Sequence, residues 1–301
     1  MTKRVVALCA ITLLAAACAG SSPASPTPTP SSSPSPSPSP STSPSPTTPP
    51  AAGLYLRAWQ SQALPPPSTF LNGPMLTVSD GIVIDNNVAI PLIFPGPLMV
   101  LPNARPITQD GEQALIEQAR ELGLLDGATD LTGGGVAPGG VTANLLMVVD
   151  GTRHELTGNP EKLRLCGDRP CQVDPATPEA FAAYWWLLQS TDAWLGQHLG
   201  PSVQYQPERL AVLVVPPATE NSGIAPNEVE WPLEDFASFG VVFPGGAGTR
   251  CATVTGDEVE ALLPALLSAN QMTVFVDSAG TKQSLNVRAL VPLEPSPCSD
   301  R

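Results

Sequence analysis

The chain has 301 residues, of which 42% are hydrophobic, and its formal net charge is −13 at pH 7. A chain of this length can form one large domain or two small ones. The excess of acidic residues argues against nucleic acid as a partner, because a polyanion would be repelled.

The N-terminal residues have the layout of an export signal. An apolar run over residues 5–17 follows two cations and ends at Cys18. The run is shorter than the roughly 20 residues that a bilayer-spanning helix needs. Small residues ahead of a cysteine are what lipoprotein processing requires, so we expect residues 1–17 to be a signal peptide and Cys18 to carry diacylglyceryl and palmitate. The alternative is an ordinary secretory signal that is cut near Ala17.

A segment rich in Pro, Ser and Thr follows the cysteine. Residues 21–50 consist almost only of these three types and include no charged residue. Such a segment cannot bury apolar area, and its prolines favour extended polyproline II, which rises about 3.1 Å per residue. We expect residues 18–52 to be the lipidated cysteine and a spacer that holds a folded domain at the outer face of a bacterial cell membrane.

The remaining chain contains matches between its two halves, in the same order and at similar spacing. Each half has an apolar strand-like run, a Phe-Pro-Gly motif, a helix start at a threonine and a hairpin. In the first half these are residues 54–59, 94–96, Thr108 and 149–152, and in the second half they are 210–215, 243–245, Thr255 and 276–281. Ordered repetition of this kind indicates internal duplication. The sequence therefore predicts an α+β fold of two tandem repeats, residues 53–157 and 210–301, each an antiparallel sheet with one packed helix.

Local signals support the two helices and the hairpins. In the first helix Thr108 is a candidate N-cap and Gly123 can end the helix. Its apolar residues recur at helical spacing, and they are Leu115, Ile116, Ala119 and Leu122. In the second helix Thr255 begins a capping box, and the apolar stripe is Val259, Leu262, Leu263 and Leu266. Asp-Gly pairs at 80–81 and 150–151 provide the positive φ angles that two-residue hairpin turns need.

Residues 158–209 are expected to join the two repeats through a disulfide loop and a central helix. The helix is predicted over residues 178–199, with Thr177 as N-cap and Pro178 at the first helical position. Its large apolar residues are Phe181, Tyr184, Trp185, Trp186, Leu188, Trp194 and Leu195. We expect this helix to pack between the two sheets as shared core. The alternative is that some of its aromatic side chains reach a ligand groove.

Four cysteines remain after the signal and Cys18: Cys166, Cys171, Cys251 and Cys298. An even number in an exported chain indicates two disulfides. We expect Cys166–Cys171, which closes a short turn, and Cys251–Cys298, which ties the C-terminal tail to a strand. A redox pair matches less well, because the first two cysteines are separated by four residues rather than two. Neither histidine has zinc-ligand spacing to the cysteines.

Known catalytic motifs are not found. The sequence has no Gly-x-Ser-x-Gly elbow, no phosphate loop and no His-Glu-x-x-His motif. No cofactor or metal is expected, because acids such as Asp85 and Asp130 lack the spacing of a calcium loop. One cluster could carry glycosidic chemistry, since paired acids beside an aromatic residue are typical of sugar sites. It consists of Glu228, Glu230, Trp231, Glu234 and Asp235.

Three motifs connect the folded part with a known group of proteins. They are Phe94-Pro95-Gly96-Pro97, Asn103-Ala104-Arg105-Pro106-Ile107 and the terminal Pro295-Ser296-Pro297-Cys298. In these motifs the chain resembles a family of uncharacterised lipoproteins from actinobacteria and related bacteria. The resemblance spans most of the folded part and implies export and a lipid anchor. It implies no catalytic residue.

We therefore expect a lipid-anchored cell-envelope protein that is a non-catalytic binding or scaffold module. Its expected partners are the membrane, through the lipid, and an envelope protein. The alternative is an envelope hydrolase that acts on glycan or wall material through an acid pair near Trp231. A third hypothesis is a structural protein of the cell wall that has no specific ligand.

Overall fold

The computed structural model describes residues 53–61, 70–88, 92–134, 140–217, 225–243 and 248–298. The predicted signal peptide, Cys18, the predicted spacer and the Pro-Gly part of the second Phe-Pro-Gly motif lie outside these residues. The described part is an α+β structure dominated by two sheets, of eight and six strands, with four α-helices. No helix in it is long and apolar enough to cross a membrane.

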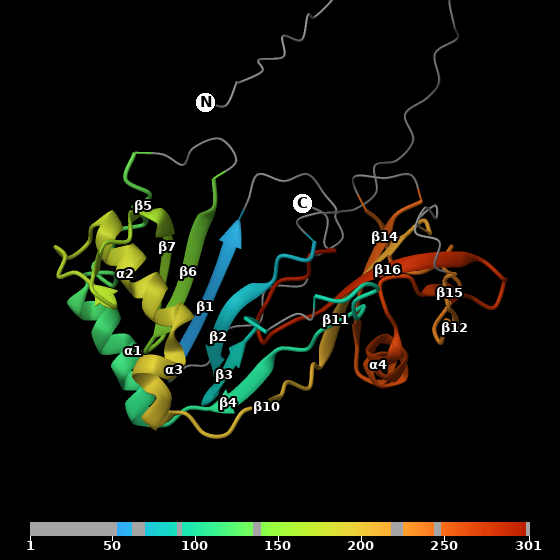
Figure 1. The fold of residues 1–301 in the computed structure, drawn as a ribbon, viewed down its shortest axis with the longest axis horizontal. Helices are drawn as coiled ribbons and strands as arrows, with labels where there is room; N and C mark the ends of the chain where they lie inside the picture. The colour runs from blue at the N-terminus through green and yellow to red at the C-terminus, as the bar shows by residue number, and fades with distance from the viewer. Residues whose placement is uncertain are drawn as a thin grey trace, which may run out of the picture. The chain divides into compact units, whose positions relative to one another are not determined.

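The first sheet has β1 in its middle (Figure 1). Its strand order is β10 (Val203–Gln204), β4 (Asn103–Pro106), β3 (Ile82–Asp85), β2 (Pro74–Ser79), β1 (Leu54–Ser61), β6 (Thr142–Val149), β7 (Thr152–Gly158) and β5 (Asp130–Leu131). The two predicted Asp-Gly turns connect β2 with β3 and β6 with β7. Both residues of each turn have positive φ, so the turn chemistry predicted from sequence is confirmed.

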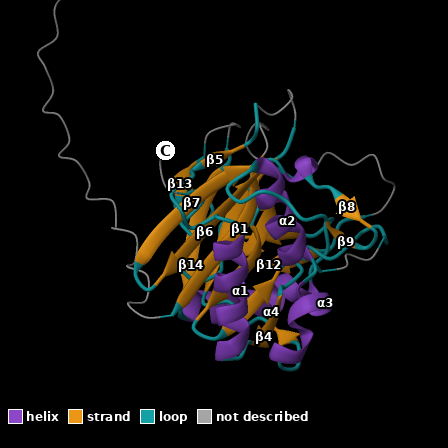
Figure 2. Cartoon of the chain, turned by 90° about the vertical axis from the view of Figure 1, so that its left-hand side faces the viewer, coloured by secondary structure: helices purple, strands orange, loops and turns teal. Residues whose placement is uncertain are grey.

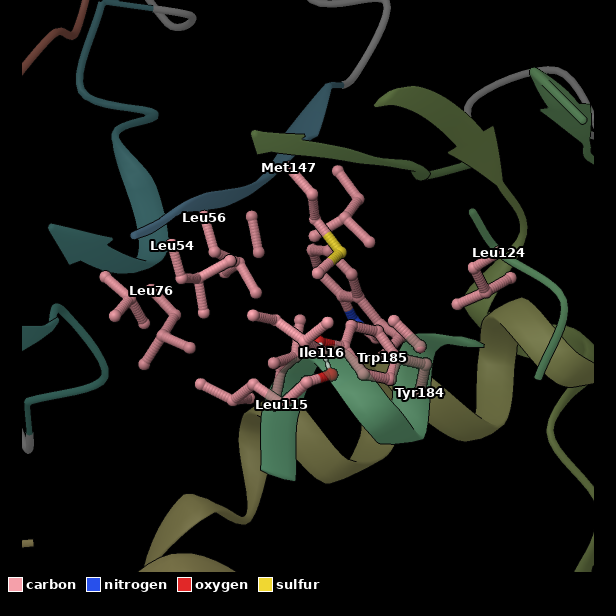
Figure 3. Close-up of a cluster of buried hydrophobic side chains, with 14 of the residues drawn as sticks. Leu54, Leu56, Leu76, Leu115, Ile116, Leu124, Met147, Tyr184 and Trp185 are labelled. Atoms are coloured by element: carbon pink, nitrogen blue, oxygen red, sulfur yellow. Dashed lines mark hydrogen bonds between the residues drawn. The ribbon is translucent and has the colours of Figure 1, made fainter. Parts of the chain in front are cut away.

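Three helices cover one face of the first sheet (Figures 1 and 2). They are α1 (Gln109–Glu121), α2 (Pro178–Gln189) and α3 (Thr191–Leu195). The core beneath them includes Leu56 and Met147 from the strands, Leu115 from α1 and Tyr184 from α2, each at most 1% exposed (Figure 3). Truncating a leucine in such a core typically costs about 2–5 kcal/mol. This core therefore fixes the three helices on the sheet.

The start and end of α1 follow the local signals in its sequence. The side chain of Thr108 accepts a hydrogen bond from the backbone N–H of Gly111 and so caps the helix. Gly123, two residues after the helix ends, has a φ of 67°, which is the left-handed conformation that glycine adopts most easily. Both predictions for this helix are confirmed.

The helix predicted over residues 178–199 is broken into three pieces. These are α2, α3 and the 3-10 turn η2 (Gly196–His198). The break falls at Ser190, whose φ of −122° and ψ of 32° are not helical. The predicted N-cap is confirmed, since the side chain of Thr177 accepts a hydrogen bond from Ala180 N at 3.2 Å.

The expectation that this helical segment packs between the two sheets is wrong. Phe181, Trp185 and Leu195 are all buried in the core of the first sheet. Gly158 at the end of β7 allows the close approach of α2: a Cβ at this position would lie only 2.2 Å from the Phe181 ring. The helical segment therefore packs on the first sheet alone, and its side that faces away from this sheet is not covered by the second sheet.

The second sheet has the order β12 (Glu228–Glu230), β15 (Val274–Val276), β16 (Lys282–Ala289), β11 (Arg209–Val215), β14 (Arg250–Thr255) and β13 (Val241–Val242). The pair β12–β15 is parallel, as is β5–β7 in the first sheet. The prediction of purely antiparallel sheets is therefore corrected at one edge of each sheet. In both pairs the added strand is only two or three residues long and reaches its partner through intervening elements, as parallel pairing requires.

Helix α4 (Asp257–Ser268) covers one face of the second sheet. Of its predicted apolar stripe, Val259, Leu262 and Leu266 are buried, and Leu263 is partly buried against the same core. The N-cap is Gly256 rather than Thr255, which still belongs to β14. Of the predicted capping box, only the hydrogen bond from Thr255 N to Glu258 Oε2 is present, at 3.5 Å. Met99 and Leu101, from the range assigned to the first repeat, are also buried in this core.

The segment that follows β16 contacts both sheets. Tyr55 on β1 donates a hydrogen bond from its hydroxyl to Pro292 O at 3.2 Å. Glu294 forms an ion pair with Arg288 of β16, with 2.6 Å between Oε1 and Nη1. Both side chains are largely buried, at 7% and 13% exposure. The C-terminal segment therefore links the two sheets through specific polar contacts.

A short hairpin of β8 (Leu165–Cys166) and β9 (Arg169–Pro170) stands apart from both sheets. The Cys166–Cys171 disulfide closes it, with a Cα–Cα distance of 4.9 Å. The second disulfide joins Cys251 of β14 to Cys298 in the C-terminal segment, with a Cα–Cα distance of 5.2 Å. Both pairs are those expected from the sequence.

The two sheets share some topology but not a common strand order. In each sheet the first strand, β1 or β11, lies between one neighbour that precedes α1 or α4, namely β2 or β14, and one neighbour that follows it, namely β6 or β16. In the first sheet the first strand of the following hairpin, β6, pairs with β1. In the second sheet the last strand of the hairpin, β16, pairs with β11. The order of that hairpin is thus inverted, and the duplication remains a prediction.

Candidate functional site

A groove of about 1230 Å³ lies on the outer side of the helices that cover the first sheet. Its lining side chains come from α1 (Gln118, Glu121, Leu122), from the loop of residues 168–175, from α2 (Ala183, Trp186, Leu187) and from α3 (Ala193, Trp194). Figure 2 shows the β8–β9 hairpin beside these helices. The groove therefore forms where three helices and the disulfide loop meet.

Two of the five tryptophans of the chain line this groove, Trp186 and Trp194. Trp185 is only 2% exposed and points into the core of the first sheet. Successive helical residues are about 100° apart, so Trp186 is directed away from that core. The indole N–H of Trp194 donates to Leu187 O at 2.8 Å, which fixes its ring. Within the described residues, the indole N–H of Trp186 has no hydrogen-bond acceptor.

Six polar side chains line the groove together with the two tryptophans. They are Gln118, Glu121, Asp168, Arg169, Gln172 and Asp174. Three carboxylates and one guanidinium give this rim a negative charge. None of these six side chains forms a hydrogen bond or an ion pair with another described residue. Their donors and acceptors are therefore available to a ligand.

The loop wall of the groove is held at both ends. The Cys166–Cys171 disulfide closes the hairpin, and Cys171 N donates to Arg164 O at 2.9 Å. At the other end, Ala176 N donates to Leu122 O at 2.8 Å, directly after α1. A wall that is already fixed loses little conformational freedom when a ligand binds, and this favours affinity.

The cluster predicted around Trp231 does not form an open site. Trp231 is 3% exposed, and its ring packs against Phe236, Phe239 and Phe275, with centroid distances of 4.9, 5.1 and 6.1 Å. Its indole N–H donates to Glu234 O at 2.7 Å. The indole is therefore a core side chain of the second sheet and presents no face to a ligand.

The carboxylates near Trp231 have separate surroundings. Glu228 on β12 forms an ion pair with Lys282 on β16. The side chain of Asp235 accepts a hydrogen bond from the hydroxyl of Ser278. Glu230 and Glu234 are exposed. The structure thus places two of these acids in local contacts and leaves two in solvent.

Asp277, which the sequence analysis did not single out, organises the neighbouring loop. It is 6% exposed and accepts hydrogen bonds from Phe236 N at 3.0 Å, Ala279 N at 3.1 Å and Thr281 N at 2.7 Å. Burial raises the pKa of a carboxyl, but here the N–H donors outweigh burial and lower the pKa of Asp277 below its usual range. The ionised carboxylate therefore holds the loop that carries Phe236 under Trp231.

No group of three or more His, Cys, Asp or Glu side chains within the described ranges is arranged to hold a metal ion. The acids considered for calcium have local partners instead. Asp85 Oδ1 accepts from Asn87 N at 2.8 Å, and Asp130 Oδ1 accepts from Thr132 N at 2.9 Å. These are turn contacts of the kind that aspartate makes with the backbone two residues on.

Sequence reasoning found part of the groove. It placed Trp186 and Trp194 among the aromatic residues that could reach a ligand, but it treated Asp168 and Arg169 only as a turn between two cysteines. One signal was available: the helical segment has large aromatic residues on more sides than one packing face requires. That α1 supplies the opposite wall could not be deduced from local sequence.

No family model, curated protein or solved structure matches this chain. The resemblance to lipoproteins of actinobacteria therefore remains an expectation from sequence motifs. A fold by itself does not define an activity, so the chemistry of the groove is the evidence that bears on function.

Proposed function

We propose that this chain is a non-catalytic ligand-binding module of the bacterial cell envelope. In this proposal the lipid on Cys18 holds it at the outer face of the membrane, and the spacer of residues 18–52 carries the folded part away from the bilayer. The groove between α1, α2, α3 and the disulfide loop is its binding site.

The observation that carries the proposal is that Trp186 and Trp194 line one groove. Tryptophan offers a large rigid apolar surface with a polar N–H, and it is enriched where proteins bind their partners. Binding sites typically combine apolar and aromatic side chains with a few convergent polar groups. This groove has that composition.

The groove chemistry favours binding over catalysis. Its lining includes no serine, threonine, histidine or lysine, and its one cysteine, Cys171, is in a disulfide. Nucleophilic catalysis needs a nucleophile beside a base. The three carboxylates of the groove are exposed to solvent, whereas a carboxylic acid that donates a proton near neutral pH is typically shielded in an apolar pocket.

Retention by isolated cell envelopes tests the binding function. The full chain with Cys18→Ala is secreted without lipid and then mixed with envelopes of the same cells. We expect it to sediment with them, and Trp186→Ala in the same background to remain in the supernatant.

The matched control is Trp59→Ala, because Trp59 is a partly buried tryptophan outside the groove that lies under Arg57. This variant should still sediment. If removing Trp186 leaves retention unchanged, the groove is not the binding site.

The membrane anchor is tested separately on intact cells. Cys18→Ala should release the protein into the medium, while the unchanged chain should remain with the membrane and incorporate labelled palmitate. A Cys18→Ala variant that stays in the membrane fraction would show that lipidation is not the anchor.

A further inference from the structure

We infer that the groove binds a neutral oligosaccharide. This inference rests on the proposed function and names the chemical class of its ligand. It follows from the charge of the groove, from the chemistry of its side chains and from its size.

Charge argues against an anionic ligand. The rim carries Glu121, Asp168 and Asp174 against the single cation Arg169, and the whole chain has a net charge of −13. Repulsion between exposed charges acts over a Debye length, about 8–10 Å at physiological ionic strength. A phosphate-bearing polymer or a uronic-acid chain would meet this repulsion along the rim.

The side chains of the groove match a sugar. A pyranose ring has a face of C–H groups, which packs on an indole plane, and an edge of hydroxyl groups. A hydroxyl both donates and accepts hydrogen bonds, so it can pair with a carboxylate, an amide or a guanidinium. All three line the same groove as Trp186, for example Asp174, Gln172 and Arg169.

A cationic peptide matches less well. Charge alone would favour it, since three carboxylates outweigh the single cation Arg169, so the argument against it rests on the exposure of the aromatic residues. Tight peptide and protein partners also depend on anchors that are fully desolvated in closed pockets. Trp186 and Trp194 are only half-buried, and half of the other residues that line the groove are exposed. An open surface of this kind suits a ligand that stays partly hydrated.

The size of the groove indicates several sugar units. Small-molecule pockets usually measure roughly 300–1,000 Å³, and this groove measures about 1230 Å³. Trp186 and Trp194 come from successive helices, so a chain of linked rings can contact both. A single monosaccharide would fill only part of the space.

Isothermal titration calorimetry with defined probes tests the inference. The protein is the secreted full chain with Cys18→Ala, and the probes are neutral N-acetylglucosamine and maltose oligomers, an oligogalacturonate and an oligolysine. We expect binding of a neutral oligosaccharide, and at least about tenfold weaker binding for Trp186→Ala, because this variant loses one of the two indole faces on which a sugar ring would pack. Trp59→Ala, outside the groove, should bind like the unsubstituted chain. Circular dichroism of each variant confirms that it is folded.

The dependence of binding on salt concentration distinguishes a neutral ligand from a charged one. Binding of a neutral sugar should change by less than about twofold between about 0.05 and 0.5 M NaCl, because no ion pair forms. Oligolysine binding that depends on Trp186, without sugar binding, would overturn the ligand class and leave the proposed function standing. Oligogalacturonate binding that depends on Trp186 would likewise overturn the ligand class. If no probe binds in a way that depends on Trp186 while envelope retention still does, the ligand class fails and the proposed function stands; if envelope retention is also independent of Trp186, the proposed function fails.

Discussion

Replacing Cys166 and Cys171 by alanine tests whether the short disulfide serves the groove or the fold. Its cysteines are 5 residues apart in sequence, whereas Cys251 and Cys298 are 47 apart. A cross-link stabilises a protein mainly by restricting the unfolded chain, and the effect grows with the logarithm of the loop length. This relation gives about 2 kcal/mol for the short disulfide and about 4 kcal/mol for the long one.

Urea unfolding, followed by circular dichroism without reductant, measures both values. The unsubstituted chain is compared with the two double-alanine variants, and the midpoints and slopes give the free energy of unfolding in water. We expect the variant without Cys166–Cys171 to lose about half as much stability as the variant without Cys251–Cys298. An equal or larger loss for the short disulfide would refute the reasoning from loop length.

Ligand retention should show the opposite order. Cys171 lines the groove, and its disulfide holds the loop wall. Cys251 and Cys298 belong to a buried cluster of the second sheet and are not among the groove residues. Envelope retention should therefore fall when Cys166–Cys171 is removed and persist, under conditions where the protein is folded, when Cys251–Cys298 is removed. Full retention without the short disulfide would show that a fixed wall is not needed.

Three further changes test the packing and electrostatics of the fold. Gly158→Ala would place a methyl group 2.2 Å from the Phe181 ring, so we expect a loss of about 2 kcal/mol in urea unfolding; an unchanged midpoint would contradict this packing. Glu294→Gln leaves the guanidinium of Arg288, 13% exposed, without its counter-charge, and should cost about 3 kcal/mol. Replacing both residues by apolar ones of similar size should cost much less, and an equal cost would argue against uncompensated charge as the cause. Folding lowers the pKa of Asp277. The carboxylate of Asp277 therefore stabilises the folded protein at pH values above the pKa of this group in the unfolded chain, about 4. This stabilisation is lost as pH falls through the pKa of the folded state. Asp277→Asn should thus be less stable than the unsubstituted chain at neutral pH, with a difference that narrows below about pH 4; a constant difference would contradict this sign.

The elements that sequence predicted well depend on neighbours in the chain. Thr108 and Gly123 mark the start and the end of α1 through contacts within one or two turns. The Asp-Gly pairs form hairpin turns because of their own φ preferences. The disulfide pairing followed from the number of cysteines and from the short turn between Cys166 and Cys171. Such signals act over a few residues and can be read without knowing the fold.

The features that sequence predicted poorly depend on contacts distant in the chain. The inverted hairpin in the second sheet depends on which of its strands pairs with β11, and that partner, β16, lies about 70 residues further along the chain. Trp231 looked like a ligand contact beside several acids, but Phe275 of β15, far along the chain, packs against its ring, together with Phe239 from the loop that follows Trp231. Periodicity indicates that a residue faces a core, but it does not indicate which core.

The groove combines both kinds of information. Trp186 could be picked out because Trp185 already occupies the side of α2 that faces the sheet. The walls of the groove could not be predicted, since α1 lies about 60 residues before α2 in the chain and the disulfide loop carries no helical or strand pattern. Binding sites built from several elements are therefore only partly predictable from sequence.

Site-specific photo-cross-linking on intact cells tests the binding function of the groove most directly. A photo-reactive phenylalanine analogue is placed at position 173, which lines the groove, in the otherwise unchanged lipid-anchored chain, and at position 59 as the control. We predict one discrete adduct with an envelope component from position 173 and none from position 59. The same adducts from both positions, or none from position 173 in a folded and anchored protein, would contradict the binding function of the groove.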